Sequence, residues 1–160
     1  MKMRFLNVFM SLAVIWSALL LTAGCGGRVS RLTAEETDLI MSSDGLMRVL
    51  LVTSPEDSLV LRTPCTDLAE EDLLSEVYEH LACRMIATVT DSTQDGVGLA
   101  APQVGLNRRV VAGMRYDKPG YLFEVYPNIY IEYYSEETQT GPEGCLSIPG
   151  PAGEVERSQR

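Results

Sequence analysis

Two short stretches of this chain hold side chains that can do chemistry. The first, Gly96–Gly105, is small and apolar, is interrupted by glycines, and carries one amide side chain at Gln103. The second follows about forty residues later and places the thiol of Cys145 just behind the carboxylate of Glu143. Because glycines remove side chains where a backbone turns sharply or approaches a ligand, the two stretches can form a binding site. The structural alternative is a buried turn and an inert core thiol.

Taken together, the two stretches resemble the sequence motifs of the peptide deformylases. That family carries GxGLAAxQ and EGCLS, and this chain matches both, at 96–103 and 143–147. The resemblance implies a metal-dependent hydrolase that removes the formyl group from N-formylmethionyl peptides. It implies that Cys145 is a thiolate ligand of a divalent metal, ferrous iron first, with zinc or nickel as substitutes. Such a metal lowers the pKa of its bound water and makes hydroxide available near neutral pH.

The resemblance also implies which residues face the substrate. The Gln103 amide and the backbone N–H of Leu146 would face the formyl oxygen as it becomes an oxyanion, each donor contributing about 3 kcal/mol. Gly98 would pair its backbone with the extended peptide, and Glu143 would lie at the edge of the pocket. The substrate-binding residues implied in this way are Gly96, Val97, Gly98 and Glu143.

One family motif is absent from the sequence. HExxH supplies two histidine ligands and the glutamate general base, but the one histidine, His80, precedes both matched motifs. A catalytic metal of this kind needs three protein ligands, so we expect a C-terminally truncated deformylase that lacks two ligands and the base. Two alternatives stay open, a non-catalytic lipoprotein that binds formyl peptides and an inactive remnant. A metal pair of His80 with Cys83 is geometrically conceivable, although a flank histidine and a core cysteine are the ordinary explanation.

The length and the net charge of the chain limit the functions that it can have. Its 160 residues leave room for one domain at most. The formal net charge of −9 argues against nucleic-acid binding, which needs a basic face. The cysteines support export without a disulfide framework; a Cys65–Cys145 bond remains possible but would consume the expected ligand.

Residues 1–25 have the features of an export signal. A positively charged start is followed by an almost unbroken apolar run and then by the small residues of Leu21–Cys25. The sequence LTAGC resembles a bacterial lipobox, which implies that Cys25 is lipidated and becomes the first residue of a lipoprotein anchored in the membrane of the cell envelope. The alternative is an uncleaved membrane anchor with an incidental cysteine.

The pattern of apolar and polar residues predicts the helices and strands that position the two motifs. Residues 26–45 are expected to form a tether, with a short helix started by a capping box at Thr33–Glu36. The clearest helix runs from Asp67 to about Thr90, because apolar residues recur there every three or four positions. Strands are expected at 46–53, 109–114 and 121–134, a turn at 54–57, and loops at 135–142 and 149–153. The predicted fold is therefore α+β, a partial deformylase-like domain over 46–160 with mixed or antiparallel sheets around one helix and incomplete at its C-terminus.

Overall fold

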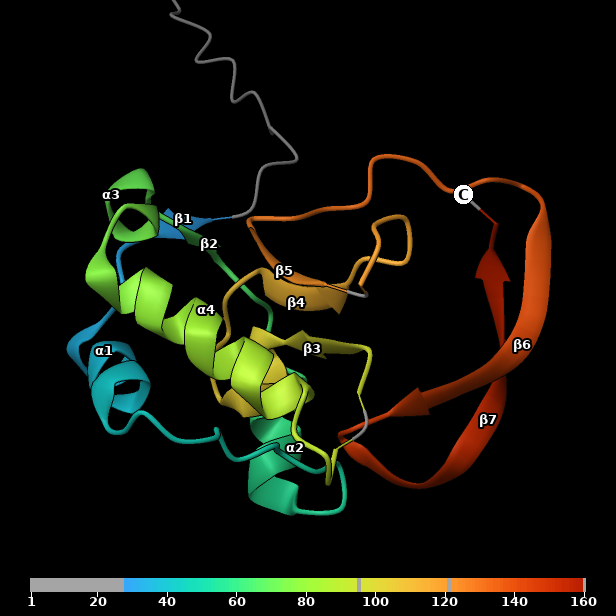
Figure 1. Cartoon of the computed structure of the whole chain (residues 1–160), viewed down its shortest axis with the longest axis horizontal. Helices are drawn as coiled ribbons and strands as arrows, with labels where there is room; N and C mark the ends of the chain where they lie inside the picture. Colours follow the sequence, from blue (N-terminus) through green and yellow to red (C-terminus); the bar gives the residue numbers. More distant parts are fainter. Residues whose placement is uncertain (1–27, 95, 121, 160) are drawn as a thin grey trace, which may run out of the picture.

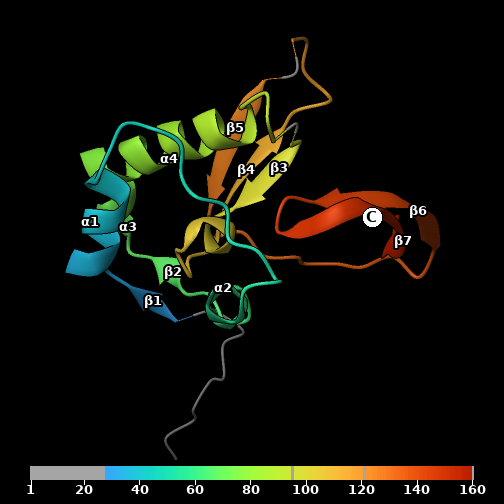
Figure 2. The same ribbon diagram turned by 90° about the horizontal axis from the view of Figure 1, so that it is seen from below.

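The computed structural model describes residues 28–94, 96–120 and 122–159. The helices are α1 (Ala34–Met41), α2 (Pro55–Leu61), α3 (Glu70–Leu73), α4 (Glu76–Val89) and the 3₁₀-helix η1 (Ala101–Val104). The strands are β1 (Val29–Ser30), β2 (Asp67–Leu68), β3 (Gly98–Ala100), β4 (Val110–Met114), β5 (Phe123–Pro127), β6 (Thr138–Cys145) and β7 (Ile148–Ser158). Helix α4 lies against the β3–β5 sheet, while the β6–β7 hairpin projects from one end of the body in both views (Figures 1 and 2).

The core lies between α4 and the antiparallel sheet, whose strand order is β3-β4-β5. Ser75 caps the N-terminus of α4, since its hydroxyl accepts a hydrogen bond from the N–H of Tyr78 at 3.3 Å. Its apolar stripe then buries Leu81, Met85 and Val89 completely. The α+β prediction, with sheet packed on one helix, is confirmed.

The long helix begins later than predicted. Asp67 is not a helix cap, because it lies in β2, pairs with Val29 in the parallel β1–β2 ladder, and forms an ion pair with Arg109. The short helix α3 ends at Leu73, and a new cap at Ser75 starts α4. The sequence placed the helix start too early because the Asp67 carboxylate binds Arg109 instead of capping a helix.

The segment expected to be a tether is folded onto the body over its described part, residues 28–45. The capping box at the start of α1 is present, with Thr33 and Glu36 bonded to each other's backbone N–H. Arg108, only 3% exposed, donates to the Glu36 carboxylate at 2.6 Å and to the carbonyl of Arg31 at 2.7 Å. Burial alone would raise the pKa of Glu36, but hydrogen bonds from Arg108 and Thr33 outweigh it and lower that pKa. Residues 1–25, with Cys25, lie outside the described residues.

Residues 47–52, here called the strap, were predicted as part of a strand but form no regular ladder. Instead, single backbone N–H groups reach separate elements: Met47 donates to Thr88 Oγ1 at 2.9 Å and Leu50 to the Gln103 carbonyl at 2.7 Å. Val52 donates to the carbonyl of Ser147 at 2.9 Å. The expected turn after the strap is the start of α2, which Ser54 caps. The strap therefore lies against both sequence motifs.

The strand predicted at 121–134 ends early, at Pro127. Asn128 takes a left-handed conformation with φ of 53° and exchanges two side-chain hydrogen bonds with the backbone of Leu68. Beyond it the chain has no regular structure until β6. No helix in the described part of the chain is long and apolar enough to cross a bilayer.

Most of the two regions predicted as loops around the second motif, residues 138–142 and 149–153, is strand instead. β6 and β7 pair from Thr138↔Ser158 to Cys145↔Ile148, so β7 has a partner. Prolines and glycines misled the sequence prediction, because an isolated two-stranded ribbon has free edges on which proline is tolerated. The register shifts between Glu143 and Cys145, which marks an irregularity at the second motif.

Candidate active site

The two sequence motifs meet in one cleft of about 500 Å³. Its walls come from the segment before β3, from η1, and from the turn that joins β6 to β7. The lining residues are Gln94, Gly96, Val97, Gly98, Gln103, Gly144, Cys145 and Leu146. The structure thus brings together every predicted site residue of the described chain except Glu143.

Gln103 is held with its amide in one orientation. Its Oε1 accepts the Ala100 N–H at 2.9 Å, and because that N–H can only donate, the atom facing it must be the oxygen. The Nε2 group therefore faces the other way, 3.2 Å from Ser147 Oγ and 3.8 Å from Cys145 Sγ. Gly105, at φ of 94°, ends η1 directly afterwards in a left-handed conformation that glycine adopts without strain. A neutral donor is thereby aimed into the cleft beside the thiol.

Cys145 is exposed at the end of β6, where the hairpin turns through Leu146 and Ser147. It is a free thiol, as are Cys65 and Cys83, so the possible Cys65–Cys145 disulfide is not formed. Cys65 is half-buried, and burial raises the pKa of its thiol.

Gly96 is a glycine because three elements converge on it. A Cβ there would lie 3.0 Å from Leu146 Cδ1 and 3.0 Å from Val89 Cγ2. The first motif therefore touches both the second motif and helix α4 at this one position.

Sequence analysis missed Gln94 and Gly144, which line the cleft, and Ser147, which lies beside it and bonds to Gln103. Ser147 is 3% exposed, its hydroxyl accepts from Gln103 Nε2, and its carbonyl accepts from Val52. The only signal for Ser147 in the sequence was a hydroxyl inside the second motif, and the sequence did not identify the partners of that hydroxyl.

The strap, which binds the Ser147 carbonyl, is itself held by Asp57. Hydrogen bonds from Arg48 and from the Leu51 N–H to the Asp57 carboxylate lower its pKa.

Glu143 is not part of the cleft, which corrects its expected place at the pocket edge. Its carboxylate accepts from Arg157 Nη2 at 3.0 Å, and it lines a separate hollow on the hairpin. The register of the hairpin shifts between Glu143 and Cys145, which interrupts the regular alternation of side chains between these two residues.

The described residues do not by themselves fit a metal centre. None of their His, Cys, Asp and Glu side chains gather in a group of three or more that could hold an ion. Cys145 is one donor where a catalytic site needs three. His80 lies instead against the carbonyl of Ser43, with its Nε2 3.1 Å from that oxygen.

The cleft runs along an edge of the sheet. β3 is the terminal strand in the order β3-β4-β5, and Gly98 in this strand lines the cleft. An extended peptide can add to such an edge through main-chain hydrogen bonds. Fold and site together define a class: a small α+β protein that presents an amide donor and a thiol beside a strand edge suited to an extended peptide.

The family follows from comparison with known proteins. A family model described as polypeptide deformylase matches residues 49–160. The chain belongs to the peptide deformylase family. This match includes residues 49–52 of the strap, α4, the sheet and the hairpin, so the cleft lies wholly within it.

Several curated relatives are similar over part of their length. Peptide deformylase 1 of Bacillus cereus is 42% identical over 104 residues, which cover 62% of this chain and 58% of the relative. The enzyme of Thermosynechococcus vestitus is 39% identical over 99 residues, covering 61% and 50%. That of a Roseiflexus species is 34% identical over 125 residues, covering 71% and 65%. The chain thus spans about half to two thirds of the length of these relatives.

Solved structures agree with the fold. A class I type b peptide deformylase from Acinetobacter baumannii superposes with a TM-score of 0.61 at 34% identity, covering 71% of each chain. The peptide deformylase of Thermotoga maritima gives a TM-score of 0.57 at 33% identity, covering 71% of this chain and 68% of that one.

Proposed function

We propose that this chain carries the peptide-binding and oxyanion-stabilising part of a deformylase site that acts on N-formylmethionyl peptides. The observation that carries the proposal is the fixed Gln103 amide, whose nitrogen faces the cleft 3.8 Å from Cys145 Sγ. A related deformylase from Acinetobacter baumannii has been solved with Met-Ala-Ser bound. That complex supports a short methionyl peptide as the ligand of the same cleft here.

Each residue of the cleft has a role in this proposal. The peptide lies extended along β3, where Gly98 pairs with its backbone. Gln103 Nε2 and the Leu146 N–H donate to the formyl oxygen as negative charge develops on it. A preorganised donor of this kind contributes about 3 kcal/mol to the transition state. The Gln103 donor needs no rearrangement, since Ala100 and Ser147 already hold its amide.

Metal dependence is general in the family, and Cys145 is the residue that would hold the ion. Ferrous iron is the metal we propose, with zinc or nickel as substitutes. When bound, such an ion supplies a water of lowered pKa. Because the described residues provide only one of three donors, no step of this proposal is routed through the metal.

We also propose that the chain is exported and lipidated on Cys25, so that it works at the membrane of the cell envelope. The LTAGC sequence after an apolar run supports this placement. If Cys25 is lipidated, the mature chain should begin at Cys25 and incorporate labelled palmitate. A Cys25→Ser variant should incorporate no label. An unlabelled chain found wholly in the cytosolic fraction would contradict it.

The activity test uses the full chain, purified anaerobically with ferrous iron and mixed with formyl-Met-Ala-Ser. Formate release is measured together with metal content and peptide binding. Where the parent chain binds the metal, Gln103→Leu should bind it equally but release formate roughly two to three orders of magnitude more slowly. Gln139→Leu is the matched control, because this exposed amide lies on β6 outside the cleft and should leave the rate unchanged.

Three outcomes separate the alternatives. Formate release that depends on Gln103 supports the proposal. Equal rates for Gln103→Leu and the parent chain would refute the role of this amide. Peptide binding without formate release, persisting in Cys145→Ala, would make the protein a peptide binder rather than a hydrolase.

A further inference from the structure

The body of the protein begins very close to the proposed lipid anchor. Only Gly26 and Gly27 separate Cys25 from Arg28, whose carbonyl accepts a hydrogen bond from the Asp67 N–H at 2.9 Å. Since a chain extends by at most about 3.6 Å per residue, the Cα atoms of Cys25 and Arg28 lie within about 11 Å of each other. Acyl chains on Cys25 would therefore hold the surface around Arg28 against the lipid headgroups.

That surface continues directly into an exposed apolar segment. In β2, Asp67 bonds to Arg28, and the next residue, Leu68, exchanges two hydrogen bonds with the Asn128 side chain. From Asn128 the chain runs on through Ile129–Tyr134, here called the tyrosine segment. Its exposed fractions are 43% for Ile129, 68% for Tyr130, 65% for Ile131, 63% for Tyr133 and 65% for Tyr134.

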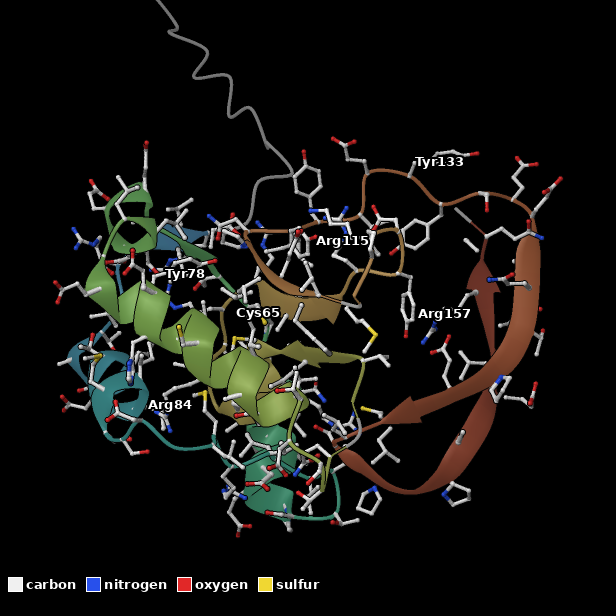
Figure 3. The ribbon with its side chains drawn as sticks, viewed as in Figure 1. Cys65, Tyr78, Arg84, Arg115, Tyr133 and Arg157 are labelled. Carbon is white, nitrogen blue, oxygen red and sulfur yellow. The ribbon has the colours of Figure 1, made fainter. Side chains whose placement is uncertain are left out.

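The figures place this segment on the same edge as the chain's entry into β1. Figure 1 shows β1 and the stretch after β5 along the upper edge of the view, opposite α2. Figure 3 shows Tyr133 at that upper edge, beyond the sheet. Strand β1, which begins four positions after Cys25 in the sequence, and a run of exposed tyrosines thus share one side of the body.

We propose that the tyrosine segment, with the surface around Arg28, rests on the bilayer to which the lipidated Cys25 anchors the chain. This proposal depends on the lipidation proposed above. Tyrosine is enriched at membrane interfaces because its ring is apolar and its hydroxyl stays hydrated. Isoleucine side chains between the rings add apolar area that the acyl boundary can cover. A contiguous exposed apolar patch of this kind often marks an interaction surface.

The charges around the segment predict which lipids it accepts. Glu132 lies within it and accepts a hydrogen bond from the Tyr130 hydroxyl at 3.1 Å, and Glu136 and Glu137 follow. Two arginines, Arg28 and Arg31, lie close to Cys25 in the sequence. The Arg31 side chain is 65% exposed and forms an ion pair with Asp72. Because carboxylates outnumber cations along the segment, apolar burial rather than attraction to anionic headgroups drives the contact. Anionic lipid should therefore not strengthen it.

The test places a fluorescent reporter in the segment of the full, lipidated chain. Trp16 is the only tryptophan and lies in the leader that cleavage before Cys25 removes. Tyr133→Trp and Tyr130→Trp are the reporters, and Leu59→Trp on α2, 73% exposed, is the control on the opposite edge. Each variant is reconstituted into phosphatidylcholine vesicles with or without brominated acyl chains, and tryptophan quenching is measured.

We expect both segment reporters to be quenched roughly two-fold more strongly than Leu59→Trp, with blue-shifted emission, because interfacial side chains lie at the headgroup–acyl boundary. Replacing part of the lipid by phosphatidylglycerol should not increase the quenching. Equal quenching of reporters and control in a chain that mass spectrometry shows to be lipidated would overturn the membrane-contact proposal alone. A mature chain without lipid on Cys25 would overturn this proposal and the anchor together, whereas formate release tests the deformylase proposal separately.

Discussion

The body and the hairpin of this protein are built in opposite ways. The body, residues 28–127, surrounds a buried core that includes Leu81, Met85 and Leu99, and buried charges such as Arg108 tie its N-terminal segment down. Between Thr138 and Ser158, the described hairpin has a single buried residue, Ser147. The hairpin is held mainly by its own ladder, and isolated two-stranded ribbons are marginally stable in water.

The candidate site lies on the join between these two regions. Gln103 belongs to the body and Cys145 to the hairpin, so the distance from amide to thiol depends on contacts across the join. The contacts include hydrogen bonds from Gln103 and Val52 to Ser147, the approach of Gln103 Nε2 to Cys145 Sγ, and the packing of Gly96 against Leu146. Substitutions in the body should therefore change the fold, and substitutions at the join should change the site while the fold persists.

The largest effect is expected from breaking the body itself. Leu99 on β3 is 1% exposed in the core, and Leu99→Ala should lower the free energy of unfolding by about 3 kcal/mol through lost burial and a cavity. Ile148 on β7 is 57% exposed, and Ile148→Ala should change it by less than about 0.5 kcal/mol. Urea denaturation followed by circular dichroism measures both. Similar losses for the two variants would mean that the hairpin shares the core's cooperativity.

The same contrast explains how much the sequence could predict. Periodic apolar residues identified α4, and β-branched residues identified β4, because a packed body imposes a pattern on its sequence. The capping box of α1 was also recognisable, since Thr33 and Glu36 form it within one turn. The two motifs supplied the cleft residues, but only through the family resemblance.

What the sequence could not predict lies in non-local partners. The sequence around Arg108 does not predict its bond to Glu36 on α1. The sequence of the strap does not predict that the Val52 N–H donates to the carbonyl of Ser147. The hairpin was mistaken for loops because its edges need no apolar alternation and tolerate proline. The place of Glu143 was missed because a shift in strand register cannot be inferred from composition.

A smaller effect is expected from crowding the join. A Gly96→Ala side chain would approach Leu146 and Val89 at 3.0 Å, so these side chains must shift, at a cost of about 1–2 kcal/mol. Gly98→Ala is the matched control, because the nearest atom to its added carbon, the Ala112 carbonyl oxygen, is 3.6 Å away. Denaturation measures the cost, and the rate at which Cys145 reacts with a thiol reagent reports the displaced second motif. If Gly96→Ala and Gly98→Ala behave alike, the glycine at 96 is not required by the contact with Leu146.

The smallest effect on stability should be the most specific to the site. Ser147→Ala removes the acceptor of Gln103 Nε2 but keeps the carbonyl that binds Val52, so the hairpin should stay attached. One neutral hydrogen bond is worth about 1 kcal/mol, so the Gln103 side-chain amide should exchange its protons with water about five-fold faster. Solution NMR measures this exchange and also the protection of the Val52 N–H, which should not change. Ser158→Ala, at the far end of β7, is the control. Unchanged Gln103 exchange would show that Ala100 alone orients the amide, and loss of Val52 protection would show that the hydroxyl, rather than the backbone, fastens the hairpin to the body.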